Sequence, residues 1–243
     1  MISNAMIPVV RTRRMLQHFA DSIWIADGPP VRFMGALLPT RMIVVKLSDG
    51  SLWINSPTMA PRATIDLIAA MGPVRYLIAP TAFHTWRLEA GHRAFPDAAL
   101  WSAPTVTREQ LRIPVAGRLG DRPPADWAND LDQLIFKGSF AIKEVEFLHK
   151  PSGTVVLADL IQNYPAKPGD VFGNALRGLG GVLNGGVPLD IKLSFATNRT
   201  LARQSLERLL SWDFDKLIIA HGQCIEYGAR AFVEKAFRWL KPR

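Results

Sequence analysis

The chain has 243 residues, of which 48% are hydrophobic and 21% are charged, a length and composition typical of one α/β domain with a sizeable core. This balance excludes a largely disordered chain, and no apolar run reaches the roughly 20 residues that a membrane-spanning helix needs. A single cysteine excludes an internal disulfide. Because no secretory signal is visible at the start of the chain, we expect a cytoplasmic protein.

The formal net charge is +8, and such a charge suits either nucleic acid or an anionic small molecule as partner. The basic residues are scattered, however, and no predicted helix carries a continuous basic face. No motif that interleaves aromatic and basic residues for RNA binding appears either. The distribution therefore favours an anionic small-molecule substrate over nucleic acid, and no membrane partner is expected.

In chain order, the first half predicts the elements β-β-β-α-β-α-β. The predicted strands are residues 24–27, 42–47, 52–55, 76–79 and 99–103, and the predicted helices are residues 61–71 and 88–95. We expect a turn at Gly28 to end the first strand, and Asp49-Gly50 predicts a hairpin between the next two. Hairpin strands followed by strand–helix alternation indicate a mixed sheet with at least one helical layer.

The second half predicts three further strands before a glycine-rich stretch, and then a helix, a strand and a helix. The strands are residues 134–136, 144–148, 154–158 and 216–220, and the helices are residues 200–210 and 229–240. Residues 149–153 form a predicted hairpin turn. Residues 164–190 carry few helix or strand signals and predict a cap or lid. Without repeats or a boundary, residues 1–243 form a single predicted domain, with residues 1–20 as an N-terminal extension.

Three polar residues share one context, because each follows an apolar strand. His84 comes after residues 76–79, Asp159 directly follows residues 154–158, and His221 directly follows residues 216–220. One such residue alone is more often a cap or turn residue. Ligand sites gather beyond strand ends, however, where loops converge over a rigid sheet.

Two imidazoles and one carboxylate suit zinc, iron or manganese and leave positions open for water or substrate. If His84, Asp159 and His221 hold one ion, we expect their ligating atoms to converge to within roughly 3–4.5 Å.

Two segments resemble the metallo-β-lactamase-like superfamily. Residues 155–159 resemble a strand of those hydrolases that ends in an aspartate, and that aspartate bridges two metals. Residues 218–222 resemble their late strand that ends in a histidine, and that histidine binds the second metal. Residues 76–103 resemble the strand, ligand loop, helix and next strand of that fold. The resemblance covers residues 24–240. It implies an α/β fold, the αβ/βα sandwich with mixed sheets and outer helices.

More narrowly, the chain resembles an uncharacterised bacterial and plant branch of the superfamily. That branch carries a Pro-x-x-x-His loop, a His-Lys-Pro-Ser turn and a Trp-Asp-Phe-Asp segment, found here at residues 80–84, 149–152 and 212–215.

The superfamily's signature His-x-His-x-Asp-His falls on residues 79–84 and is largely lost. Ala79 and Thr81 stand at the two leading histidines, Phe83 stands at the aspartate, and only His84 remains. His149 is the one candidate for the first site's third histidine, but its tight turn does not match the usual position and we do not assign it. The first metal site therefore loses two of its ligands.

What the resemblance leaves is a mononuclear site made of His84, Asp159 and His221. It implies a metal-dependent hydrolase of a small ester, lactone, amide or phosphoester, in which one zinc, iron or manganese ion activates water and Asp159 acts as the catalytic base. The lost signature equally supports a non-catalytic binding or scaffold protein without metal. A third alternative, suggested by the charge of +8 and by relatives that cut RNA, is a nucleic-acid-processing or nucleic-acid-binding protein.

Overall fold

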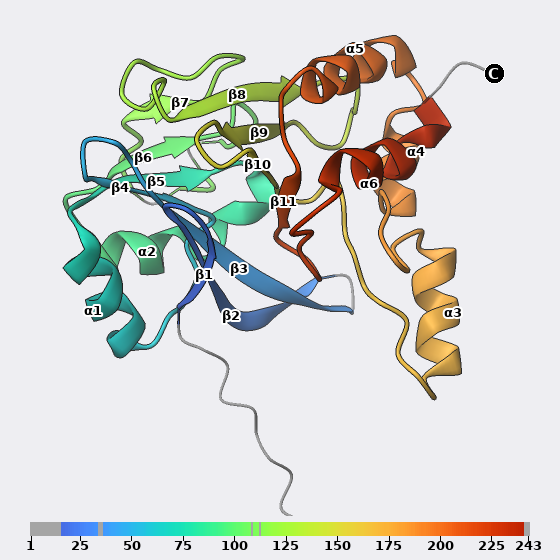
Figure 1. Cartoon of the computed structure of the whole chain (residues 1–243), viewed down its shortest axis with the longest axis horizontal. Coiled ribbons are helices and arrows are strands. Elements are labelled where there is room, and N and C mark those ends of the chain that lie inside the picture. Colours follow the sequence, from blue (N-terminus) through green and yellow to red (C-terminus); the bar gives the residue numbers. More distant parts are fainter. Residues whose placement is uncertain (1–15, 34–35, 108, 112, 241–243) are drawn as a thin grey trace, which may run out of the picture.

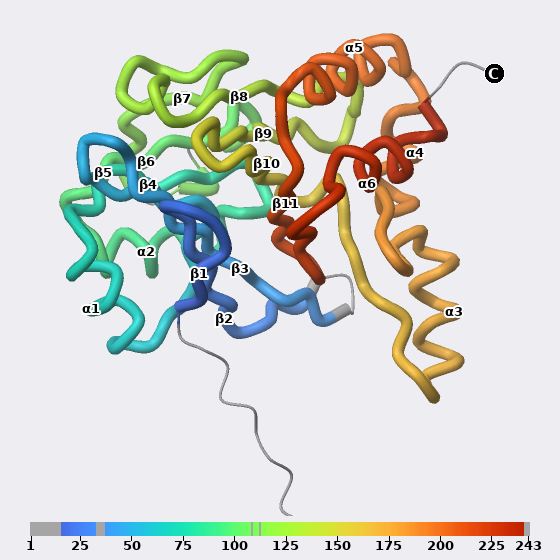
Figure 2. The backbone as a smooth tube through the Cα atoms, viewed as in Figure 1, coloured from blue at the N-terminus to red at the C-terminus, as the bar shows by residue number. Residues whose placement is uncertain are grey.

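The computed structural model describes residues 16–33, 36–107, 109–111 and 113–240, and its sheets and helices form a layered sandwich (Figures 1 and 2). Of the expected N-terminal extension, residues 1–15 lie outside the described part. Residues Gln17–Ala20 form the first strand of a sheet.

The first sheet is mixed and has seven strands in chain order. They are β1 (Gln17–Ala20), β2 (Ile23–Phe33), β3 (Ala36–Lys46), β4 (Leu52–Asn55), β5 (Val74–Ala79), β6 (Ala99–Ser102) and β7 (Gly117–Arg118). Strands β1 to β4 are antiparallel, and β4 to β7 are parallel. This is the mixed arrangement that hairpin strands followed by strand–helix alternation predicted.

The expected turn at Gly28 is wrong, because β2 continues through it to Phe33. The pairing of β2 with β3 shifts register between Gly28 and Val31. A bulge of this kind accommodates Pro29 and Pro30, whose nitrogens cannot donate to the ladder. The result is a long β2–β3 hairpin that projects past the sheet (Figure 1).

The second sheet has four strands in the order β11-β10-β9-β8. They are β8 (Leu131–Phe136), β9 (Glu144–His149), β10 (Thr154–Leu157) and β11 (Lys216–Ile219). Strands β8, β9 and β10 are antiparallel, which confirms the predicted hairpin at residues 149–153, and β10 and β11 are parallel.

Except for α3 (Val171–Leu179), which extends away from the sheets, the helices lie on the outer faces of the two sheets (Figure 1). The helices are α1 (Arg62–Met71), α2 (Leu88–Ala94), α3 (Val171–Leu179), α4 (Leu189–Ser194), α5 (Arg199–Leu210) and α6 (Ala229–Ala236), with 3₁₀ turns η1 (Ala82–Thr85) and η2 (Arg238–Leu240). Among the described helices, none has the length and apolar character needed to cross a membrane.

Three apolar clusters hold the layers together. Between the sheets, the rings of Trp53 and Phe147 meet edge to face at 4.8 Å. On the outer side of the first sheet, Ile68 of α1 is fully buried. On the outer side of the second sheet, Leu209 of α5 and Val233 of α6 are fully buried. The layer order is therefore helix, sheet, sheet, helix.

The glycine-rich segment 164–190 contains a helix that the sequence did not predict. Helix α3 begins after Asp170, whose side chain accepts a hydrogen bond from the backbone N–H of Gly173 at 3.0 Å. Apolar residues recur at helical spacing on α3, but none of its residues is buried, so this apolar face does not pack on the core. Gly173 and Gly178 lower its intrinsic helix propensity.

Candidate metal centre

His84 lies on the loop that leaves the end of β5. Thr81 begins the 3₁₀ turn η1, and its side chain accepts a hydrogen bond from the N–H of Phe83 at 3.1 Å. The N–H of Val145, at the start of β9, donates to the carbonyl of Pro80 at 3.0 Å. This bond ties the His84 loop of the first sheet to the edge of the second sheet.

Asp159 and His221 follow β10 and β11, which are parallel neighbours, so both side chains emerge at the same edge of the second sheet. Gly222 allows the sharp turn after His221, because its φ is 106° and an added Cβ would overlap the carbonyl oxygen of Asn163.

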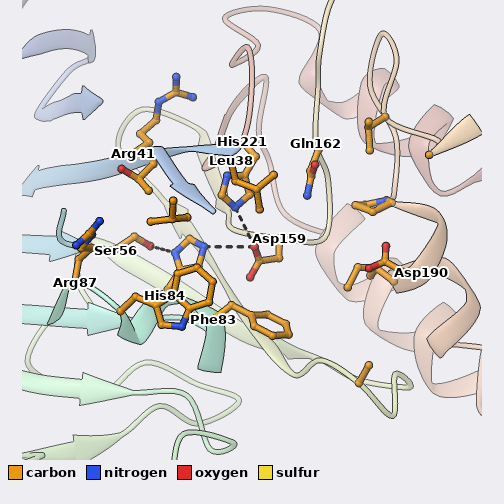
Figure 3. Close-up of a pocket in the computed structure, with 18 of the residues that line it drawn as sticks. Leu38, Arg41, Ser56, Phe83, His84, Arg87, Asp159, Gln162, Asp190 and His221 are labelled. Atoms are coloured by element: carbon orange, nitrogen blue, oxygen red, sulfur yellow. Dashed lines mark hydrogen bonds and ion pairs between the residues drawn. The ribbon is translucent and has the colours of Figure 1, made fainter. Parts of the chain in front are cut away.

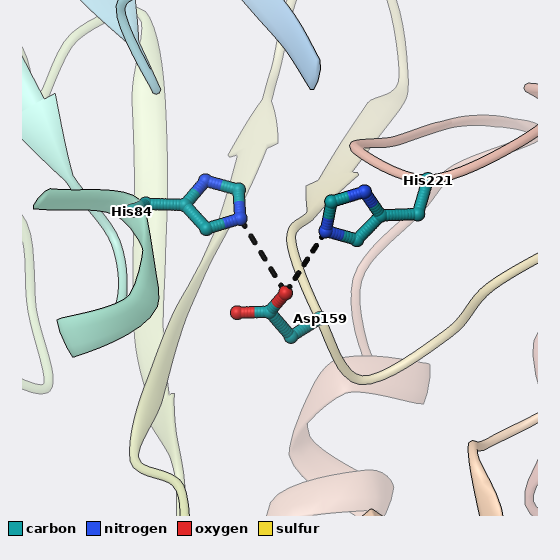
Figure 4. Close-up of side chains that lie close together, drawn as sticks. All are labelled: His84, Asp159 and His221. Atoms are coloured by element: carbon teal, nitrogen blue, oxygen red, sulfur yellow. Dashed lines mark hydrogen bonds and ion pairs between the residues drawn. The ribbon is translucent and has the colours of Figure 1, made fainter. Parts of the chain in front are cut away.

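The three side chains converge (Figure 4). Oδ1 of Asp159 lies 3.1 Å from Nε2 of His221 and 3.4 Å from Nε2 of His84, and one ligand atom from each residue lies within 4.8 Å of the others. Their side chains are only 6% to 10% exposed. The structure therefore brings together the three residues that the sequence singled out.

The tautomer of His84 follows from its hydrogen bonds. The hydroxyl of Ser56 donates to Oδ1 of Asn55 at 2.6 Å and lies 2.6 Å from Nδ1 of His84. Because a hydroxyl has one proton, Ser56 must accept a hydrogen bond from Nδ1–H of His84. The lone pair of a neutral His84 is then on Nε2, the atom that faces Asp159.

The same reasoning applies to His221. Its Nδ1 lies 2.7 Å from the carbonyl oxygen of Pro39, and a carbonyl can only accept, so Nδ1 carries the proton. The guanidinium of Arg41 holds the turn around His221, since it donates to the carbonyls of Ile219 at 2.7 Å and Gly222 at 2.9 Å. A neutral His221 therefore also presents the lone pair of Nε2 to Asp159.

Two imidazole lone pairs and a carboxylate oxygen that face one another repel unless a positive charge sits among them. That charge is either an extra proton on an imidazole or a metal ion. Ligand atoms bound tetrahedrally to zinc at about 2.1 Å lie about 3.4 Å apart, close to the 3.1 and 3.4 Å from Asp159 to the two histidines. All three ligand atoms lie within 4.8 Å of one another, slightly wider than the roughly 3–4.5 Å expected, and the donor chemistry fits one ion of the zinc type.

The charges at the centre act on one another strongly. Burial alone would raise the pKa of Asp159, but His84 and His221 outweigh it and hold the pKa well below the usual range. Burial alone would lower the pKa of His84, but the charge of Asp159 outweighs it and raises that pKa. Asp159 is thus a stable anion at the centre.

Two further side chains fix the orientation of Asp159. Thr81 donates from Oγ1 to Oδ2 of Asp159 at 2.9 Å, so the residue that replaces a signature histidine supports a ligand. The carboxylate of Glu144 accepts from the backbone N–H of Asp159 at 2.7 Å and of Leu160 at 3.0 Å. Burial and the charge of Asp159 raise the pKa of Glu144 to about 7.

His149 lies away from the centre, as its turn context indicated. It pairs with Thr154 at the start of β10, whereas Asp159 follows the other end of that strand. Its Nδ1 lies 2.7 Å from the hydroxyl of Ser152, and burial lowers its pKa.

The centre opens into a cavity of about 500 Å³ (Figure 3). Its polar wall includes Arg41, Arg87, Gln162 and Asp190 besides the three converging residues, and its apolar wall includes Val31, Leu38, Phe83, Trp86, Val182 and Ile191. Sequence reasoning missed Ser56, Glu144 and Asp190. For Glu144 a signal existed, because two glutamates spaced two apart on a strand of apolar residues share one face.

The solved structures with this architecture are metallo-β-lactamases and related proteins. A metallo-β-lactamase from Hirschia baltica matches with a TM-score of 0.62 at 12% identity, covering 94% of this chain and 98% of that one. The enzyme FIM-1 from Pseudomonas aeruginosa, in its mono-zinc form, matches with a TM-score of 0.60 at 11% identity, covering 93% and 96%. A fragment of a protein described as a diflavin flavoprotein from Nostoc sp. PCC 7120 gives 0.66 at 10% identity, covering 93% and 94%.

The chain therefore has the metallo-β-lactamase fold, and the α/β sandwich with mixed sheets and outer helices is confirmed. Residues 20–180 match the family described as Domain of unknown function (DUF4336), and the chain belongs to that family. A search of curated proteins gave no match.

Proposed function

We propose that this protein is a metal-dependent hydrolase with a single-metal centre, formed by His84, Asp159 and His221. The observation that carries the proposal is the convergence of these residues, with both imidazole protons engaged on the far side of the rings. Two histidines and one carboxylate are a known ligand set of catalytic zinc. A relative of the same fold, FIM-1, has been solved in a mono-zinc form, which makes zinc the first ion to test.

The lost signature residues support one metal rather than two. Phe83 stands where an acidic ligand is expected, and its side chain lines the cavity. In the part of the chain that the structure describes, His84, Asp159 and His221 are the one group of three that could hold an ion.

A bound ion would lower the pKa of its water toward about 7 and polarise a scissile carbonyl or phosphoryl group. The protein's own residues prepare the site for this chemistry. Ser56 and the carbonyl of Pro39 keep the Nδ1 protons of the two histidines in place. Thr81 occupies Oδ2 of Asp159 and leaves Oδ1 for the ion.

Proton transfer needs a separate group. Sequence reasoning gave this role to Asp159, but a carboxylate whose pKa is held low has little tendency to take a proton. Asp159 and Asp190 are the carboxylates on the described cavity wall, and Asp190 lies across the cavity from Asp159 (Figure 3). We propose the ligand role for Asp159, and Asp190, on the cavity wall, is the carboxylate to test as proton acceptor.

Hydrolysis of p-nitrophenyl esters and of lactones, amides and phosphoesters by protein loaded with zinc tests the proposal. We expect turnover that a chelator abolishes, that added zinc restores, and that His221→Ala lacks. A protein that binds zinc yet turns over none of these classes would contradict the hydrolase assignment and favour a binding protein.

A further inference from the structure

We propose that the cavity beside the metal centre binds an aliphatic acyl chain, so that the substrate is an acyl ester, lactone or amide with its carbonyl at the centre. As a statement about the substrate, this inference rests on the proposed hydrolase function. As a statement about binding, it stands on the shape and chemistry of the cavity and is tested without turnover.

The apolar wall of the cavity contributes little to the core. Leu38 and Val182 line the cavity, yet neither belongs to the three buried clusters or packs against them. Apolar side chains gain free energy only when something covers them. A ligand with an apolar body, seated in the cavity, would supply that cover.

Within the cavity, apolar side chains lie next to the polar centre, while Arg87, Gln162 and Asp190 also line the wall. The centre formed by His84, Asp159 and His221 takes a carbonyl or carboxylate, while Leu38 and Phe83 lie beside it on the wall (Figure 3). A volume of about 500 Å³ lies within the range of ligand pockets that bury most of a small molecule. This layout fits a molecule with one polar end and one flexible apolar end.

The cavity mouth is also apolar. Phe83 and Trp86 on its wall are 38% and 48% exposed. Exposed apolar side chains on a cavity wall are typical of ligand-binding grooves. They allow a chain longer than the cavity to continue along the surface.

The test is the binding of hexanoate, octanoate and decanoate by titration calorimetry, with zinc-loaded and with metal-free protein. Full burial of one methylene strengthens binding about fourfold. We expect Kd to fall by about fivefold or more for each two added carbons. The carboxylate affects absolute affinity through the metal, but the ratio between chain lengths reports the apolar wall alone and should be the same in both forms.

Leu38→Glu places a charge on the wall at a half-buried side chain outside the core clusters and should abolish the dependence on chain length. If Leu38→Glu does not fold, the milder variant Val182→Gln replaces it. Val182→Gln should at least halve the dependence of Kd on chain length. The matched control is Leu67→Glu on α1, where the side chain is 47% exposed and does not line the cavity. This control should keep the dependence of the unmodified protein.

The acyl chain can come from a bilayer lipid or from a dissolved compound, and cosedimentation with phosphatidylglycerol vesicles separates these sources. Phe172 of α3 is 77% exposed, and the protein carries a net charge of +8, so anionic vesicles are the appropriate probe. Binding that Phe172→Asp removes identifies a bilayer lipid. Absence of binding, with the chain-length dependence intact, identifies a dissolved acyl compound.

Equal Kd values for the three alkanoates, or a dependence that Leu38→Glu and Leu67→Glu weaken equally, would overturn the acyl-chain assignment. The failure of the hydrolase proposal would look different: no metal and no turnover, with the chain-length dependence still present in the metal-free protein.

Discussion

The hydroxyl of Ser56 donates its only proton to Asn55 and therefore accepts a hydrogen bond from Nδ1 of His84, 2.6 Å away. This relationship fixes the tautomer of His84 and directs its Nε2 lone pair toward Asp159. Outer partners of this kind orient the ligand imidazole and raise its basicity, so their loss typically weakens metal affinity 10- to 100-fold, to order of magnitude.

Loss of the Ser56 hydroxyl should weaken zinc binding by about 10- to 100-fold. Because Ser56 has a φ of 54°, alanine there keeps the backbone strain that serine already bears, whereas glycine relieves it. The two variants Ser56→Ala and Ser56→Gly should share the loss of affinity and differ in stability, as measured by competition with a chromophoric chelator and by urea unfolding. Affinity retained in Ser56→Gly would show that the hydroxyl has no such role.

Glu144 should contribute more to stability than Glu146, although both are fully buried. The carboxylate of Glu144 accepts three backbone N–H groups around Asp159, and an amide in its place would turn an NH₂ toward these donors. We expect Glu144→Gln to lower the free energy of unfolding by about 1–3 kcal/mol, measured in urea at pH 7. If Glu144→Gln lowers the free energy of unfolding no more than Glu146→Gln does, the hydrogen bonds from Glu144 to the backbone around Asp159 do not have this role.

Glu146 predicts a pH dependence of stability. Its carboxyl group is fully buried, and burial, the charge of Glu144 and a hydrogen bond with Glu144 raise its pKa well above the usual value. The folded protein thus keeps a proton that the unfolded chain releases above about pH 4.3. This group's contribution to stability is full below that pH and is lost as the pH rises toward the folded pKa.

Glu146→Gln should remove that contribution, which amounts to at most about 1.4 kcal/mol per pH unit. Urea unfolding at pH 5 and pH 8 measures it. The unmodified protein should lose more stability between these values than Glu146→Gln does. Parallel losses in the two proteins would mean that Glu146 is ionised in the fold.

Asp190 should affect turnover without affecting the metal. If it accepts the proton, Asp190→Asn lowers kcat by about 10²- to 10⁴-fold and leaves zinc content unchanged. Asp66→Asn on α1, an exposed aspartate paired with Arg62, is the control and should keep full activity. A variant Asp190→Asn with normal kcat would return the proton-transfer role to Asp159.

The sequence predicted most strands and the converging residues for one physical reason. His84, Asp159 and His221 each follow a short apolar strand whose buried pattern is clear; Asp159 and His221 share one edge of the second sheet, and His84 reaches them from the first sheet. Local signals were therefore sufficient to identify the three residues before their distances were known.

Other features depend on partners that are distant in sequence. The support that Glu144 gives to Asp159 spans 15 residues, and the contact between Arg41 and the carbonyl of Ile219 spans 178. No local pattern encodes such pairs. Helix α3 was missed although its apolar side chains recur at helical spacing, because the many glycines of the segment favoured an irregular cap.

The central claim is that His84, Asp159 and His221 hold one metal ion. Elemental analysis of protein purified without chelator, beside His221→Ala purified in the same way, tests it most directly. The account predicts about one equivalent of zinc, iron or manganese in the unmodified protein and none in His221→Ala. A folded protein that contains no metal at neutral pH, and that takes up none when zinc is supplied, would contradict it.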